Sequence, residues 1–194
     1  AKVLSANDYS PFGVILKDRD AGEIEELPNL SFKLDNAGWA MIDKKYDTAE
    51  EIKAFTLEAW VKTDESNGNQ TSNWSIIDFD KSDYFNLYVH GGNGRVYCSA
   101  SSPNSQFDDY ASNISVNDNT WHHIAVSYSM DDGELKIYID GVLDVTHTSV
   151  SADHPNGIGT GALTRYGVLG DGSESTTSAV GGGRNNKYFT GEMD

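Results

Sequence analysis

Short runs of alternating apolar and polar residues recur along the chain, and they predict β-strands rather than helices. The clearest run is Trp121–Ser129 (WHHIAVSYS), in which Ile124, Val126 and Tyr128 share one face. Further strands are expected at Leu30–Leu34, Trp39–Ile42, Phe55–Lys62, Ser75–Phe79, Tyr84–His90, Arg95–Ser99, Glu134–Ile139, Val142–Thr148, Gly167–Leu169 and Tyr188–Thr190.

Turn signals separate these runs, and Asp140-Gly141 is the strongest hairpin signal among them. Asp47–Ala54 (DTAEEIKA) is the one helical candidate, because a capping residue precedes early glutamates. The pattern predicts an all-β fold, an antiparallel two-sheet β-sandwich of the jelly-roll type with at most one short helix. Loops are expected at Asp64–Asn73, Ser101–Asp109, Ser151–Gly161 and residues 171–187.

The composition narrows the range of partners. The net charge of −16 over 194 residues argues against binding to nucleic acid or to an anionic membrane. No apolar run approaches the roughly 20 residues of a membrane-spanning helix. Cys98 is the single cysteine, so no intrachain disulfide is possible. The first residues lack the apolar core of a signal peptide, so an exported chain would be a mature form or an excised domain.

The adjacent residues His122 and His123 suggest chemistry at first sight, but neighbours on a strand point to opposite faces. They therefore cannot both bind one metal ion. His122 shares its face with an apolar row and is expected to be a hydrogen-bonded core histidine. His123 is expected to be half-buried or to face the second layer. Catalysis also lacks support. The patterns most similar to a glycosidase carboxylate pair are Glu23–Glu26 in the N-terminal segment and Glu134 with Asp140, and neither has the required tight spacing. No G-x-S-x-G or H-E-x-x-H motif occurs.

Calcium is the best-founded chemistry, because Asp78, Asp80 and Asp83 in DFDKSD gather oxygen ligands at a tight turn. Solvated turn residues are the slightly favoured alternative for this cluster. Ligand contacts are expected from Trp74 and Tyr110. Trp60 and Trp121 lie within strands and are expected in the core. Three further residues near the C-terminus are predicted ligand contacts: Asn185, Asn186 and Tyr188.

Several stretches together resemble a known family: LSFKLDNAGWAMI, FTLEAWVKT, SIIDF, FNLYV, NTWHHIAVSYSMDDGELKIYIDG and YFTGEMD. Residues 30–194 are similar, in the same order, to laminin-G-like and concanavalin-A-like jelly rolls near the pentraxins, and the domain is assigned to residues 28–194. The resemblance implies two curved sheets, frequent structural calcium, and binding of carbohydrate or protein ligands by an accessory module of a larger secreted or surface protein.

The resemblance also marks departures. Such domains usually continue after a motif like Gly191–Asp194 into a last strand, whereas this chain stops there, so we expect truncation or another segment at that edge. Asp35, Asn36 and Asp194 join the calcium candidates at one rim. Residues 1–27 are expected to be an N-terminal extension or the end of a preceding repeat segment. Their VLSANDYSPFG stretch resembles the tail of bacterial YD-repeat (RHS-type) proteins.

The sequence therefore favours a noncatalytic binding module, extracellular or on the cell surface. It would recognise carbohydrate or a protein partner through rim loops and would be stabilised by calcium. Two alternatives stay open: a glycan-active hydrolase or lyase on the same sandwich, and a structural or assembly domain of a large surface protein.

Overall fold

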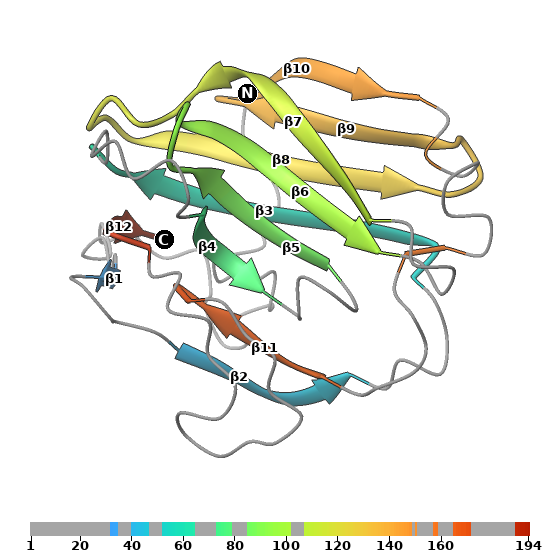
Figure 1. Ribbon diagram of the computed structural model, residues 1–194, viewed down its shortest axis with the longest axis horizontal. Coiled ribbons are helices and arrows are strands. Elements are labelled where there is room, and N and C mark those ends of the chain that lie inside the picture. Colours follow the sequence, from blue (N-terminus) through green and yellow to red (C-terminus); the bar gives the residue numbers. More distant parts are fainter. Residues whose placement is uncertain are drawn as a thin grey trace, which may run out of the picture.

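The computed structural model describes residues 32–34, 40–46, 52–64, 73–78, 85–101, 107–148, 150, 157–158, 165–171 and 189–194. Its strands form two antiparallel six-stranded sheets that lie one behind the other (Figure 1). The first sheet has the order β1 (Phe32–Leu34), β12 (Gly191–Met193), β3 (Ala54–Lys62), β8 (His122–Ser129), β9 (Glu134–Ile139) and β10 (Val142–His147). The second has the order β2 (Ala40–Tyr46), β11 (Arg165–Leu169), β4 (Asn73–Asp78), β5 (Phe85–His90), β6 (Arg95–Ser101) and β7 (Phe107–Ser115).

The core fills the space between the sheets with the apolar rows that the alternation predicted. Val126 of β8 is fully buried and lies opposite Leu57 on β3 and Ile137 on β9. Leu87 and Val96 of the second sheet belong to the same buried cluster. Each such side chain contributes about 1.5–3 kcal/mol relative to an exposed position. The all-β jelly-roll sandwich is thereby confirmed.

Cys98 belongs to this core and is fully buried on β6. Burial, and secondarily the charge of Asp109, raises the pKa of its thiol to about 12. Since the thiolate is the reactive form, this cysteine is chemically inert near neutral pH.

The edge strands β7 and β10 meet through side chains. Asp144 is the extra residue in an irregularity of β10, and its Oδ2 accepts a hydrogen bond of 2.5 Å from the backbone N–H of Asn113 on β7. The Nε2 atom of His147 lies 2.9 Å from the carbonyl oxygen of Ala111. These contacts link the two sheets at one side of the sandwich and occupy part of both edges.

Three predicted elements differ from the structure. Strand β7 begins at Phe107, inside the predicted loop Ser101–Asp109. Its sequence FDDYASNIS carries few apolar residues, so the alternation is weak. The helix predicted over Asp47–Ala54 is wrong at its end, because Ile52 forms a β-bridge with Ile158 and β3 starts at Ala54. The rest of that segment lies outside the described residues.

The last strand runs over Gly191–Met193 rather than Tyr188–Thr190, because the N–H of Phe189 donates to the carbonyl of Gly170 after β11 instead. In the part of the chain that the structure describes, no helix has the length and apolar character needed to cross a membrane. The assignment of residues 1–27 to a separate segment lies outside the described residues.

Candidate ligand-binding face

The residues predicted to contact a ligand do not come together. Tyr110 is only 8% exposed and belongs to the core cluster, so its predicted surface role is wrong. It lies on β7 opposite Cys98, and this register turns its ring inward, 5.3 Å from the ring of His147. The remaining predicted contacts lie outside the described part of the structure: the side chain of Trp74, and Asn185, Asn186 and Tyr188.

The calcium candidates are also divided. Asp78 is fully buried at the end of β4 in the second sheet, whereas Asp194 follows β12 in the first sheet and exchanges backbone hydrogen bonds with Trp60. Among the described residues, no group of three or more His, Cys, Asp or Glu side chains is placed to hold a metal ion. The other candidates, Asp35, Asn36, Asp80 and Asp83, lie outside those residues, so the calcium site stays a prediction.

The ring of His122 lies between two carboxylates. Its Nδ1 is 2.9 Å from Oδ2 of Asp140, and its Nε2 is 3.1 Å from Oδ1 of Asp118. The predicted hydrogen bonding is present, and the side chain is largely buried, with 13% of it exposed. Its position in the apolar row is the first one of β8, where the row reaches the rim of the sandwich.

The charges at this rim favour the imidazolium. Burial lowers the pKa of His122, but the hydrogen bonds to Asp140 and Asp118 outweigh it, and the pKa is raised from its ordinary value. The hydroxyl and N–H of Thr120, followed by His122, lower the pKa of Asp118 to about 2. The other carboxylate oxygen of Asp140 accepts the N–H of His123 at 2.9 Å. The hydrogen bonds of His122 to Asp118 and Asp140 therefore connect the β7–β8 connection with the β9–β10 turn, which is a structural role.

Two tryptophans of the first sheet face solvent, contrary to their predicted place in the core. Trp60 is 47% exposed and Trp121 is 37% exposed. The ring of Trp60 lies 5.2 Å from that of His123, its cross-strand neighbour, at an angle of 55°. Trp121 immediately precedes β8, and extending the alternation of that strand by one residue places it on the same face as His123. We call Trp60, Trp121 and His123 the aromatic platform.

The sequence did contain a signal for this outward orientation. On β3, Trp60 shares its parity with Thr56, Glu58 and Lys62, which are all polar. The apolar row of the same strand is Phe55, Leu57, Ala59 and Val61. Position in the polar row therefore indicated exposure more reliably than the size of the indole ring did.

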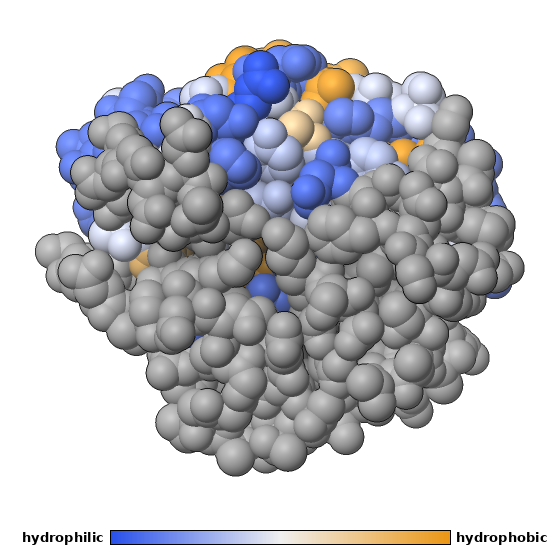
Figure 2. Space-filling view, in the orientation of Figure 1, coloured by the Kyte–Doolittle hydropathy of each residue, from blue (hydrophilic) through white to orange (hydrophobic). Residues whose placement is uncertain are grey.

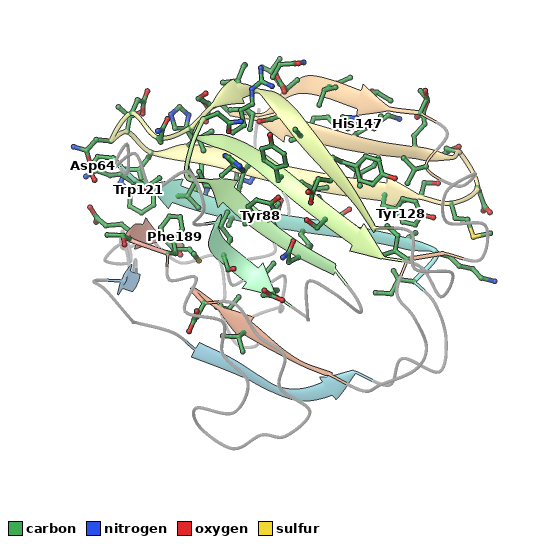
Figure 3. All side chains as sticks on the ribbon, in the orientation of Figure 1. Asp64, Tyr88, Trp121, Tyr128, His147 and Phe189 are labelled. Carbon is green, nitrogen blue, oxygen red and sulfur yellow. The ribbon has the colours of Figure 1, made fainter. Side chains whose placement is uncertain are left out.

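A groove lies on the same sheet, near the end of β8 that is far from the platform. Figure 3 shows Trp121 and Tyr128 at opposite ends of this strand. Near Tyr128 the groove has a volume of about 400 Å³. Its outward-facing lining includes Thr56, Ser127, Ser129, Glu134, Lys136 and Tyr138.

The charges on this face are mostly paired or acidic. Lys136 Nζ lies 2.7 Å from Glu134, and Lys62 Nζ lies 3.1 Å from Glu192. The Nε2 atom of His123 is 3.6 Å from Glu58 Oε2, beside Trp60. The face therefore presents aromatic surface, hydroxyl groups and carboxylate oxygens, with two amines engaged in ion pairs.

Two carboxylate pairs of the described residues are too far apart for a glycosidase. Glu134 begins β9 and Asp140 follows its end, so six residues of strand separate their Cα atoms by roughly 20 Å. On the outer face of the second sheet, Asp78 and Asp109 stand three strand spacings apart, roughly 14 Å. Glycoside hydrolases hold their two carboxyl groups about 5–9.5 Å apart. The Asp109 carboxylate moreover accepts hydrogen bonds from Tyr88 and Ser99.

A family model described as the concanavalin A-like lectin/glucanases superfamily (Laminin_G_3) matches residues 35–194. The chain belongs to this superfamily. The superfamily's laminin G and pentraxin-like members are generally non-enzymatic binding domains, although its description also includes glucanases. This membership confirms the resemblance seen in the strand motifs.

Individual relatives are distant. The rat protein "Sushi, von Willebrand factor type A, EGF and pentraxin domain-containing protein 1" is 26% identical over 135 residues, which cover 63% of this chain and 3% of that protein. A heptameric SAP-like pentraxin from Limulus polyphemus is 14% identical, with a TM-score of 0.55 and coverage of 84% of this chain and 72% of the other. The LG1–3 region of the laminin α2 chain is 16% identical, with a TM-score of 0.57 and coverage of 84% and 30%. These structures share the fold.

Proposed function

We propose that this chain is a noncatalytic module of an extracellular protein that binds carbohydrate through the aromatic platform. The observation that carries the proposal is the exposure of Trp60 and Trp121 on one face of the first sheet. Burial of a large aromatic ring is favourable, so two indoles that stay exposed on a sheet suggest a surface that a ligand covers.

The neighbours of the platform suit a sugar. Aromatic faces accept the apolar side of a pyranose ring, and a few placed polar groups then fix its hydroxyls. Glu58 and His123 lie directly beside Trp60 and supply such groups. Because β3 pairs with β8 from Ala54 to Val61, Trp60 and His123 are held side by side and lose little conformational entropy on binding.

A protein partner is the second candidate. Three apolar side chains are about half exposed or more, and they lie on the neighbouring edge strands β7 and β10: Ile114 (50%), Val142 (68%) and Leu143 (49%). Figure 2 shows apolar residues gathered above these strands. Val142 and Leu143 are neighbours on β10 and point to opposite faces, so this exposed apolar surface follows the edge of the sandwich rather than one face of it.

The proposal is tested by screening the purified chain on a glycan array and titrating the best hits by calorimetry. We expect Trp60→Ala to weaken binding at least about tenfold, which corresponds to about 1.4 kcal/mol. Ile114→Ala is the matched control, since it removes an equally exposed apolar side chain from the other sheet. Absence of any glycan binding by the wild-type chain, or equal losses in both variants, would contradict the proposal.

A further inference from the structure

We propose that the outer face of the first sheet holds an internal stretch of a linear, uncharged glycan along β8, rather than a single terminal sugar. This inference rests on the proposed carbohydrate binding and names the class of ligand. It joins two features that the structure places on one face, the aromatic platform and the groove beside Tyr138.

The outward-facing side chains of β8 are smaller than many of those on its neighbouring strands, and this difference in size extends along the strand. The outward residues of this strand after His123 are Ala125, Ser127 and Ser129, all small. On β9 the residues opposite them are all larger: Tyr138, Lys136 and Glu134. On β3 only Ala125 has a large neighbour, because Ser127 and Ser129 lie opposite Thr56 and Ala54. Glu58 lies opposite Ala125 on β3, and Tyr138 lies opposite it on β9. The small side chains of β8 therefore form the floor of a channel whose continuous wall is β9, while on β3 the wall is Glu58 alone.

The length of this channel exceeds one sugar. Trp60 and Thr56 both face outward on β3. They are four positions apart, which is roughly 13 Å along the strand. The platform occupies one end of this distance. The groove begins near the other end, where Ser127 lies opposite Thr56 on one side and Lys136 on the other. A ligand that fills both ends must therefore be an extended chain.

A peptide would have poor hydrogen bonding here. β8 is paired on both sides, with β3 and with β9, so its backbone donors and acceptors are already used. A polypeptide that binds sheets by strand addition needs a free edge. The channel offers side-chain hydroxyls and carboxylates instead, and these suit a ligand whose hydroxyl groups donate hydrogen bonds.

Charge selects against acidic glycans. Lys62 and Lys136 are engaged by Glu192 and Glu134, and the neighbouring Glu58 and Asp132 add negative charge to the face. The whole chain carries a net charge of −16. Sulfated or uronic chains would meet like charge along the channel, so an uncharged chain fits best.

The test compares ligand lengths by calorimetry, using cello-, xylo- and N-acetylglucosamine oligomers from disaccharide to hexasaccharide. In the series that binds, we expect the hexasaccharide to bind at least about tenfold more tightly than the disaccharide. Ser127→Tyr would fill the channel and remove this gain. Thr56→Tyr, an exposed position on β3, is a second blocking variant in case the first does not fold.

Thr146→Tyr is the control, because it adds the same ring to the same sheet on β10, beyond Lys136 and outside the channel. Equal affinity for short and long oligomers, with the blocking variants unaffected, would overturn the extended ligand and leave the proposed function standing. Preference for sulfated or uronic oligomers would also overturn it. No binding by any oligomer, together with a blank array, would overturn the proposed function and this inference together.

Discussion

The imidazole of His122 joins three segments of the chain through two hydrogen bonds. Asp118 belongs to the connection before β8, and Asp140 belongs to the turn after β9. Asp140 and Gly141 both have positive φ, 53° and 76°, as a tight hairpin turn requires. A single side chain therefore holds two loops at the rim next to the aromatic platform.

This arrangement predicts a pH-dependent stability. The pKa of His122 is raised in the fold, so its contribution is full below its unfolded value of roughly 6.5 and is lost as the pH rises through the folded pKa. The pKa of Asp118 is lowered to about 2, so its contribution is present above roughly 3.9 and is lost as the pH falls towards 2. The interaction between His122 and Asp118 therefore stabilises the fold most between roughly pH 4 and 6.5.

Urea unfolding of the wild-type chain and of His122→Gln should show this directly. We expect the difference in unfolding free energy between them to be larger at about pH 5.5 than at about pH 8.5. These two pH values lie on either side of the pKa of histidine in the unfolded chain, about 6.5. Asp118→Asn should reduce that pH dependence. A difference that stays constant with pH would show that His122 acts through packing alone.

At the residue scale the sequence also shows what alternation can and cannot tell. It separated His122 from His123 correctly, because neighbouring strand residues always diverge. It did not decide which face is buried, and there the large ring of Trp60 and the apparent loop context of Tyr110 led to wrong predictions. Trp60 shares a row with polar residues and faces solvent, while Tyr110 is turned inward by its register with Cys98.

Strand β12 packs so closely against β3 that its first position accepts only glycine. It lies between β1 and β3, and Gly191 starts it with φ of 141°. A Cβ atom at this position would lie 2.1 Å from the carbonyl oxygen of Lys62 on β3. That distance is far inside van der Waals contact, and backbone cannot move aside as a flexible side chain can.

Gly191→Ala should therefore destabilise the fold by more than about 1 kcal/mol, measured by thermal or urea unfolding. Gly141→Ala is the matched control, because its φ of 76° carries the backbone cost while nothing lies within 4 Å of the added Cβ. We expect the Gly191 variant to be clearly the less stable of the two. Equal losses would mean that only the backbone conformation matters at β12.

The elements that the sequence predicted best are those bounded by strong local signals. Asp140-Gly141 defined the hairpin of β9 and β10, and Glu134–Ile139 was predicted with its observed limits. β7 was largely missed because Asp108 and Asp109 at its start are polar. Its place depends on pairing with β6, a contact between segments that no local pattern encodes.

For the whole molecule, the excess of acidic residues makes calcium the cation to test. We expect added calcium to raise the melting temperature and a chelator to lower it, because a ligand that binds only the folded state stabilises it. Magnesium is the control, since its smaller octahedral site differs from the flexible oxygen cage of calcium. Identical melting in calcium and in chelator would remove calcium from the description of this domain.

The buried Cys98 has a practical consequence for all of these measurements. Because it is the only cysteine and its thiol is sealed inside the sandwich, maleimide reagents should find no native target on the folded protein. A cysteine introduced at Ser129 would then be the single attachment point for a fluorescent dye. The dye would stand at the far end of the channel from Trp60, where it would report directly on a chain arriving along β8.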